Sequence, residues 1–266
     1  MSTRAIDVVT ITDPEDPRFP FGKELWEDPH IVYHGTWSEY SSRIESDGFV
    51  HAELPFNHED VETIMRAWEA VGILDSYAKT VFFAGTPRPR RELSMTGSIW
   101  GARAYATDSG GEVARIMLKE AMDFEALCSQ DEKRIALKGR WEEGLRKSPG
   151  HLLTLNAVEV LGNSAALQTL SSQLTIARKA IEEVTKGGFP VVYTLRVEPE
   201  WFPGNWERYM FNWKKGTRAA VELRCRRDLL SNDRILAKAI YPNGTDPDCL
   251  WDGFETWAEV EALSQK

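Results

Sequence analysis

Three apolar segments in the last third of the chain constrain its fold most. They follow the pair Gly187-Gly188 and cover residues 190–197, 219–226 and 235–241. Each has the length of a strand, whereas the region before them, 123–186, shows mainly helical spacing of its apolar residues. Strands gathered late in a chain, after helices, favour an α+β fold over a doubly wound parallel sheet.

The rest of the chain offers weaker signals for single elements. A short strand is expected at residues 31–33, ending at His34-Gly35-Thr36, and a helix at 38–47 that stops at Gly48. We expect one domain over residues 1–266, with an irregular leader at 1–28 and insertions at 55–95 and 123–188. Further expectations are helices at 57–72, from 108 onward and at 254–263, a strand at 80–84, and a turn-rich, then extended segment at 97–107.

Charge is distributed unevenly along this chain. Its net charge of −9 argues against wholesale electrostatic binding of nucleic acid. Residues 208–238, however, hold nine basic and three acidic side chains, a local charge of +6. This stretch is either a solvated strand face or a site for a phosphate-bearing partner, such as a dinucleotide or an RNA.

Several classes of protein are excluded by what the sequence lacks. No apolar run approaches the roughly 18–20 residues of a membrane span, and the start of the chain has no signal-peptide pattern, so we expect a cytoplasmic protein without a membrane partner. The three cysteines lie far apart, and no histidine stands at zinc-ligand spacing from them, so no metal is expected. Glycine-rich nucleotide motifs are missing as well.

Three residues remain as candidates for chemistry. His34 stands at a predicted strand end, Tyr105 stands where an extended segment gives way to a helix, and Glu222 lies on a late strand. Strand alternation places Glu222 and Arg224 on one face and Val221, with Leu223 and Cys225, on the other. Taken singly, these are a backbone-bonded core histidine, a packing tyrosine and a salt-bridged, solvent-facing strand.

Their order along the chain resembles the His–Tyr–Glu pattern of the ADP-ribosyltransferase superfamily, in its diphtheria-toxin and poly(ADP-ribose) polymerase branch. The segment from Tyr33-His34-Gly35-Thr36 to Phe49 is similar to the first motif of that branch. Tyr105-Ala106-Thr107-Asp108 is similar to the second motif. The third motif resembles the run Tyr209, Asn212-Trp213 and Val221-Glu222-Leu223, which has the same spacing from the tyrosine and the tryptophan to the glutamate.

The resemblance implies a split antiparallel β-sheet core with helical insertions, and NAD as cosubstrate. It implies that His34 binds a ribose hydroxyl, that Gly35, beside Thr36, holds the nicotinamide carboxamide, and that Tyr105 stacks on the nicotinamide ring. Glu222 would accept the 2′-hydroxyl of the ribose and stabilise the positive charge that develops when nicotinamide leaves. Arg224 would reach the pyrophosphate or the acceptor.

Two positions depart from the family pattern. Ile116 stands where the second ring-binding tyrosine would fall, which makes Trp100 a candidate for the other wall of the nicotinamide site. Ala220 stands two residues before Glu222, where arginine-modifying members carry an acidic or amide residue, so arginine is a poor candidate acceptor.

The function implied is mono-ADP-ribosylation of a macromolecule, either a protein or a nucleic acid (RNA or DNA). Such an enzyme would act as a toxin, effector or defence-system toxin, and an antitoxin would then be a further partner. Two alternatives stay open. With water as acceptor the same residues would make an NAD glycohydrolase, and without turnover the chain would be a silent NAD-binding or interaction module.

Overall fold

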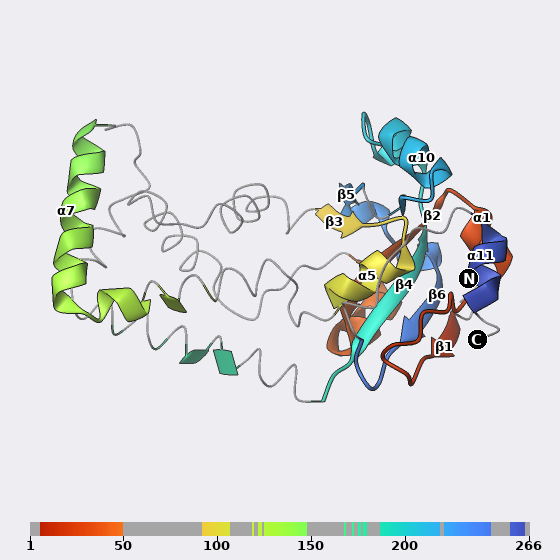
Figure 1. The fold of residues 1–266 in the computed structure, drawn as a ribbon, viewed down its shortest axis with the longest axis horizontal. Coiled ribbons are helices and arrows are strands. Elements are labelled where there is room, and N and C mark those ends of the chain that lie inside the picture. The colour runs from red at the N-terminus through yellow and green to blue at the C-terminus, as the bar shows by residue number, and fades with distance from the viewer. Residues whose placement is uncertain are drawn as a thin grey trace. The chain divides into compact units, whose positions relative to one another are not determined.

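The structure is a computed structural model that describes residues 6–49, 92–106, 125–147, 187–218, 221–245 and 256–263, with isolated positions from 119 to 179 (Figure 1). The chain divides into two compact units. The first comprises Met1–Ala52, Pro89–Gly111 and Val184–Lys266, and the second Glu53–Arg88 and Glu112–Glu183. The elements expected at 57–72, at 80–84 and from 108 onward lie outside the described residues, apart from isolated positions after 118.

The first unit contains two sheets. Four strands form the larger one in the order β1 (Asp7–Thr10), β6 (Ile235–Ile240), β4 (Pro190–Arg196) and β2 (Ile31–Trp37). The β1–β6 pair is parallel, and the other two pairs are antiparallel. The smaller sheet pairs β3 (Glu92–Met95) with β5 (Leu223–Arg226), also antiparallel.

Helices accompany these sheets, and the α+β class is therefore confirmed. The first unit holds α1 (Lys23–Glu27), α2 (Ser41–Asp47), α5 (Ile99–Ala106), α10 (Trp206–Lys214) and α11 (Trp257–Leu263). Short 3-10 helices cover Ser38–Tyr40, Pro199–Trp201, Arg227–Leu229 and Asn232–Arg234. In the second unit, α7 spans Asp131–Lys147.

The late strands do not form a single sheet. The segments at 190–197 and 235–241 become β4 and β6 of the larger sheet, as strands that pair with each other. The third segment, at 219–226, is described from residue 221 onward, and there it contributes β5, which pairs with β3 instead. The larger sheet is therefore mixed, because β1 joins it in parallel, whereas its other two strand pairs and the β3–β5 pair are antiparallel.

The N-terminal segment is more ordered than its composition predicts. The expected irregular leader contains β1 and α1, and its Phe19 and Trp26 are buried. No local pattern marks β1, because its partner β6 lies more than 220 residues later in the chain. Buried Arg103 donates hydrogen bonds to the carbonyl oxygens of Asp16 (2.6 Å) and Pro14 (2.8 Å), which fastens this segment to α5.

Where the structure describes the segment at 97–107, it forms a helix over Ile99–Ala106 and is not extended. Ser98 precedes α5, and its hydroxyl accepts a hydrogen bond from the Gly101 N–H at 3.3 Å. Ile99, Ala102 and Ala106 of α5 are buried against the larger sheet. Apolar residues at helical spacing on one packed face override the turn signal of the glycines.

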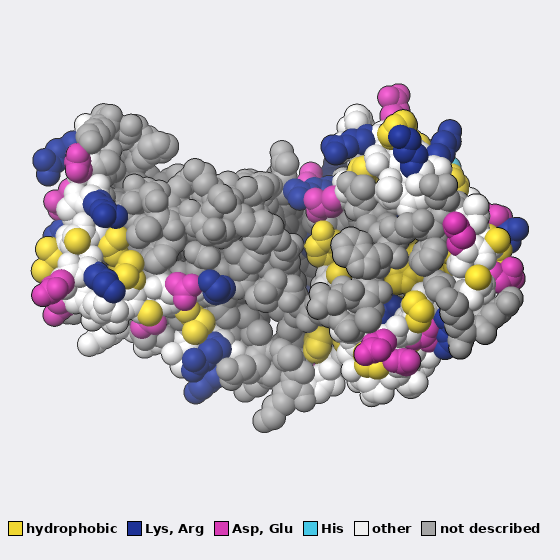
Figure 2. Space-filling model, viewed as in Figure 1, with side chains coloured by type: hydrophobic (Ala, Val, Ile, Leu, Met, Phe, Trp, Pro, Cys, Tyr) yellow, Lys and Arg dark blue, Asp and Glu magenta, His cyan; other side chains and the backbone are white. Residues whose placement is uncertain are grey.

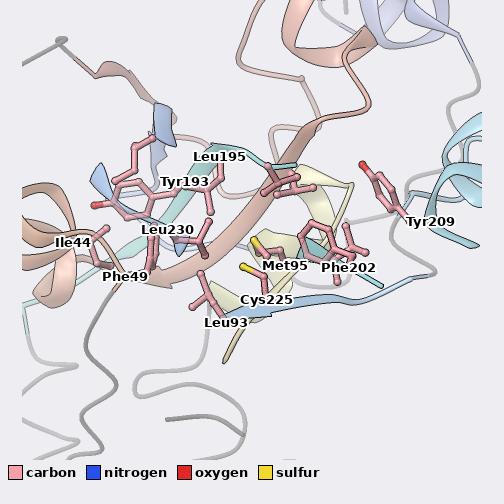
Figure 3. Close-up of a cluster of buried hydrophobic side chains, with 14 of the residues drawn as sticks. Ile44, Phe49, Leu93, Met95, Tyr193, Leu195, Phe202, Tyr209, Cys225 and Leu230 are labelled. Carbon is pink, nitrogen blue, oxygen red and sulfur yellow. The ribbon is translucent and has the colours of Figure 1, made fainter. Parts of the chain in front are cut away.

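Two apolar clusters hold the first unit together. One joins the two sheets, with Val32, Tyr193 and Leu195 from the larger sheet packed with residues of the smaller one (Figure 3). Met95 and Cys225 both belong to it, and in the β3–β5 register Cys225 lies opposite Leu93 and Met95 opposite Leu223. The second cluster covers the other face of the larger sheet and is built by α1, α5, α11 and β-strand residues, with Ile11, Phe19, Trp26, Ile31, Tyr33, Trp100, Val192, Ala239 and Val260 among its members.

Within the described part of the chain, none of the helices has the length and apolar character needed to cross a membrane.

Candidate functional site

The two sheets of the first unit meet at one backbone bridge. The Tyr33 N–H donates to the Thr96 carbonyl oxygen at 2.8 Å, and the Thr96 N–H donates back to Tyr33 at 3.0 Å. Tyr33 belongs to β2, and Thr96 directly follows β3. The bridge therefore brings the segment that carries His34 next to the smaller sheet, whose strand β5 begins directly after Glu222.

His34 lies within β2, not at the end of a strand as expected, because β2 continues to Trp37. Its Nδ1 is 2.8 Å from the carbonyl oxygen of Ser94 on β3. A carbonyl oxygen only accepts, so Nδ1 carries the proton and donates. Burial lowers the pKa of His34 to about 4. The nearby charge of Arg227 also lowers this pKa, whereas the hydrogen bond to Ser94 raises it. The imidazole is therefore neutral near pH 7, and its Nε2 is a hydrogen-bond acceptor.

The surroundings of Gly35 leave no room for a side chain. A Cβ atom built there would lie 1.8 Å from the carbonyl oxygen of Ala102 and 2.8 Å from the backbone nitrogen of Ala106. No side chain fits at such distances, so only glycine lets α5 approach β2 this closely. The glycine thereby brings the end of α5, with Tyr105, to the strand that carries His34.

The backbone of Gly35 is also oriented by the strand. Backbone polar groups alternate between the two edges of a strand, and those of Tyr33 point toward Thr96, away from β4. Those of Gly35 therefore point to the same edge of β2. Among the described residues, no hydrogen bond occupies Gly35 on this edge. One N–H donor and one C=O acceptor stand side by side there.

Glu222 immediately precedes β5, and its carboxylate is held by Arg224. The Arg224 Nη2 lies 2.5 Å from the Glu222 Oε2. This hydrogen bond is the largest cause that raises the pKa of Arg224, ahead of its burial, which works against it. Both side chains are partly exposed, at 42% for Glu222 and 33% for Arg224. The alternation predicted for this segment is confirmed, because Val221, with Leu223 and Cys225, is buried.

The strand register connects these residues. Ser94, which binds His34, is the direct partner of Arg224 in the β3–β5 pair. Opposed residues of antiparallel strands lie about 5 Å apart at their Cα atoms. The chain of contacts therefore runs from His34 through Ser94 and Arg224 to Glu222, although His34 and Glu222 are 188 positions apart in the sequence.

Tyr105 lies in the last turn of α5, and 54% of it is exposed. It stands on a helix, not at the strand-to-helix junction that we expected. Its phenol contributes, with Glu92, to the charges that raise the pKa of Arg224, after the Glu222 hydrogen bond. Tyr105 therefore lies within electrostatic range of the guanidinium group that holds Glu222.

Two further residues that were predicted to bind NAD, Thr36 and Trp100, are not grouped with His34 and Glu222 in the same way. Thr36 continues β2 beyond Gly35 and is half-buried opposite Val191 of β4. Trp100 is 1% exposed, and its indole Nε1 donates to the Pro17 carbonyl oxygen at 2.9 Å. It packs edge-on against Trp26 in the second apolar cluster. A ligand would have to open that cluster to reach Trp100, so we leave it out of the site.

The structure adds residues that sequence reasoning missed. Ser94 falls in a segment that we expected to be an insertion, and no motif marks it. Arg227 belongs to the basic stretch 208–238 and contacts the Phe49 carbonyl oxygen at 3.5 Å. Burial lowers the pKa of Arg227 to about 10, and its charge in turn acts on His34. The departures at Ile116 and Ala220 lie outside the described residues.

Across the residues that the structure describes, no group of three or more His, Cys, Asp or Glu side chains is placed to hold an ion. What the site offers is a neutral imidazole, an open backbone donor–acceptor pair, an exposed phenol and a carboxylate beside a guanidinium group. Comparison of the chain with protein-family models, curated proteins and solved structures found no match.

Proposed function

We propose that the chain is an NAD-dependent mono-ADP-ribosyltransferase whose core is of the ADP-ribosyltransferase type. NAD supplies the ADP-ribosyl group, with nicotinamide as its leaving group, and a macromolecule accepts it. The observation that carries the proposal is the contact chain from His34 through Ser94 and Arg224 to Glu222, with the open edge of Gly35 beside it. It joins residues from three distant parts of the sequence.

The Gly35 edge suits a carboxamide. A carboxamide has one acceptor oxygen and a donor NH₂ on the same side, which complement the N–H and C=O of one strand residue. We assign this backbone edge to the nicotinamide carboxamide, with the exposed Tyr105 ring as the surface on which the nicotinamide stacks.

His34 suits a hydroxyl donor. Because its Nδ1 proton is engaged by Ser94, its Nε2 accepts a hydrogen bond, and its low pKa keeps that role unchanged down to acidic pH. A ribose hydroxyl is such a donor. We assign His34 to the binding and orientation of the ribose, not to proton transfer, since a group with a pKa of about 4 is a poor general acid or base near pH 7.

The Glu222 carboxylate suits stabilisation of the positive charge that develops on the ribose. When the bond between nicotinamide and ribose breaks, its electron pair leaves with the pyridine nitrogen and the ribose becomes oxocarbenium-like. A carboxylate that accepts the 2′-hydroxyl and faces this charge stabilises the transition state more than the ground state. Arg224 holds the carboxylate in place, so we assign it a positioning role.

The test is nicotinamide release from NAD by the purified protein, compared with Glu222→Gln, with and without total RNA and cell lysate. We expect release that falls about 10²- to 10³-fold in the variant and labelled ADP-ribose on a macromolecule. Glu222-dependent release that yields only free ADP-ribose would identify an NAD glycohydrolase instead. NAD binding without release would identify a silent module, and absence of NAD binding would refute the proposal.

A further inference from the structure

The outward face of α10 combines an exposed aromatic ring with several positive charges. It consists of Glu207, Arg208, Phe211, Lys214 and Lys215, all exposed, which we call the α10 outer face. Arg208, Phe211 and Lys215 stand at helical spacings of three and four residues, so they form one stripe. Figure 2 shows basic side chains gathered with hydrophobic ones over this helix.

The opposite side of α10 fixes the helix firmly. The Tyr209 side chain is buried, and its hydroxyl donates to the Ile31 carbonyl oxygen at 3.4 Å. Beyond the helix, the Arg218 guanidinium group lies 3.7 Å from the ring centroid of Trp26 and 4.4 Å from that of Trp213. The outer face thus belongs to a helix whose other side is packed against the core.

Phe211 is the central residue of this face. Its side chain is large and apolar, yet 59% of it is exposed, and the Lys215 Nζ lies 4.1 Å from its ring centroid. The two side chains form a cation–π pair. An aromatic ring can also stack on a flat base, and ammonium groups bind phosphates. Bases and phosphates alternate in a nucleic acid strand and offer both.

The charges of this face are available to a ligand. Among the described residues, no carboxylate forms an ion pair with Arg208, Lys214 or Lys215, although the chain as a whole is acidic. The exposed helix α7 shows the opposite arrangement, since Arg134 is paired with Asp131 at 2.7 Å. Available cations around a ring are the features that bind a single strand without sequence preference.

We propose that the α10 outer face binds single-stranded nucleic acid, with a base stacked on Phe211 and phosphates bound by the three cations. That this face docks the acceptor strand of the enzyme rests on the proposed function. The α10 outer face and Glu222 belong to one stretch of chain, because Glu222 follows Lys215 by seven positions, with Arg218 as a fixed anchor between them. Single-stranded RNA or DNA is then the class of acceptor.

The positive charge and the single exposed ring of the α10 outer face favour a nucleic acid strand over a membrane as its partner. A helix that lies on a membrane needs a broad apolar face, whereas the apolar residues of α10 other than Phe211 are turned into or against the core. A duplex hides the faces of its bases and leaves Phe211 without a stacking partner. We therefore expect unpaired strands to bind better than duplexes and lipid surfaces.

The experiment is fluorescence anisotropy with labelled oligo(U) and oligo(dT) of about 12 nucleotides, a length within the usual site sizes for single strands, in the absence of NAD. Wild-type protein is expected to bind, with log K falling against log salt with a slope of about −2, as three phosphate contacts on a single strand predict. Phe211→Ala should weaken binding about tenfold, the effect of one stacked base removed, whereas Phe211→Trp should retain it. The triple variant Arg208→Glu, Lys214→Glu, Lys215→Glu should abolish binding.

Matched controls come from α7, where Ile135 is 68% exposed. Ile135→Ala and the triple variant Lys133→Glu, Arg140→Glu, Arg146→Glu make the same kinds of change on exposed positions and should leave binding close to that of wild type. Equal losses of affinity in both sets, stronger binding to the duplex of the same sequence, or binding to vesicles of anionic lipid alone would overturn the inference. Because the assay contains no NAD, an inactive enzyme that still binds the strand refutes the proposed chemistry and leaves this inference standing.

Discussion

The imidazole Nδ1 of His34 lies 2.8 Å from the carbonyl oxygen of Ser94, and this bond ties β2 of the larger sheet to β3 of the smaller one. It sits next to the Tyr33–Thr96 bridge, so side chain and backbone hold the two sheets at the same point. The same hydrogen bond fixes the tautomer of the imidazole and, together with the backbone bridge, helps to hold the strand that pairs with Arg224.

Replacing His34 with Gln should flatten part of the dependence of stability on pH. The pKa of His34 is about 4 in the folded chain and about 6.5 in an unfolded one. The unfolded state therefore takes up the proton first, and stability is lost as the pH falls from about 6.5 to about 4. The wild-type advantage over the variant should shrink across this window by no more than about 1.4 kcal/mol per pH unit. Urea unfolding at a pH of about 7.5, 6 and 5 measures this, and a constant difference would contradict it.

Substitution of Arg224 tests whether it positions Glu222 or binds NAD. Without the hydrogen bond from Arg224, the Glu222 carboxylate is no longer held in one orientation. We expect Arg224→Met to lower kcat for nicotinamide release about 10- to 100-fold with little change in KM, because misplacement affects the transition state more than substrate binding. Arg224→Lys should recover part of the activity. A raised KM at unchanged kcat would assign Arg224 to the binding of NAD.

Gly35→Ala should destabilise the protein strongly. The new methyl group would meet the backbone of Ala102 and Ala106, which has no flexible end to move aside. Overpacking of this kind costs about 1–3 kcal/mol, and we expect about 3 kcal/mol or more here. Gly139→Ala on α7 is the control, because nothing lies within 4 Å of its added methyl and alanine favours a helix by about 1 kcal/mol. Thermal unfolding followed by circular dichroism should therefore move in opposite directions for the two variants.

Arg218→Met should cost about 2–4 kcal/mol of unfolding free energy, through two effects on a buried side chain. Arg218 is 5% exposed, stacks between two indole rings and donates to the Trp26 carbonyl oxygen at 2.8 Å. The variant keeps the volume, but it has no charge to face the rings and leaves a buried acceptor without its donor. Arg226→Met is the matched control, because Arg226 pairs with Asp228 on the exposed surface, where ion pairs contribute about 0–1 kcal/mol. Similar destabilisation in both variants would show that the contacts of Arg218 with the two indole rings and the Trp26 carbonyl oxygen do not stabilise the fold.

Local pattern was sufficient for several elements of the fold. The helix at 38–47 is present as a 3-10 turn followed by α2, and the strands at 31–33, 190–197 and 235–241 appear as β2, β4 and β6. The outward face of Glu222 and Arg224 was predicted correctly as well. These features depend on side-chain periodicity and on glycines that end an element, both of which are local in the sequence.

Other features depended on partners far away in the chain. The leader contains β1 because β6 supplies its hydrogen bonds, and Ile99–Ala106 are helical because the small residues of this helix pack against Gly35. Trp100, a candidate for the nicotinamide site, is a core residue because Trp26 and Phe19 surround it. None of these partners is visible within a local window of residues.

The sequence by itself determined the α+β class, the order of His34, Tyr105 and Glu222, and the faces on which their neighbours lie. Only the tertiary structure decided that Ser94 of β3 connects His34 with Arg224, and that no hydrogen bond from the described residues occupies the outer backbone edge of Gly35. The physical reason is that periodicity specifies which residues become buried, whereas the pairing of strands depends on hydrogen bonds between segments more than 120 residues apart.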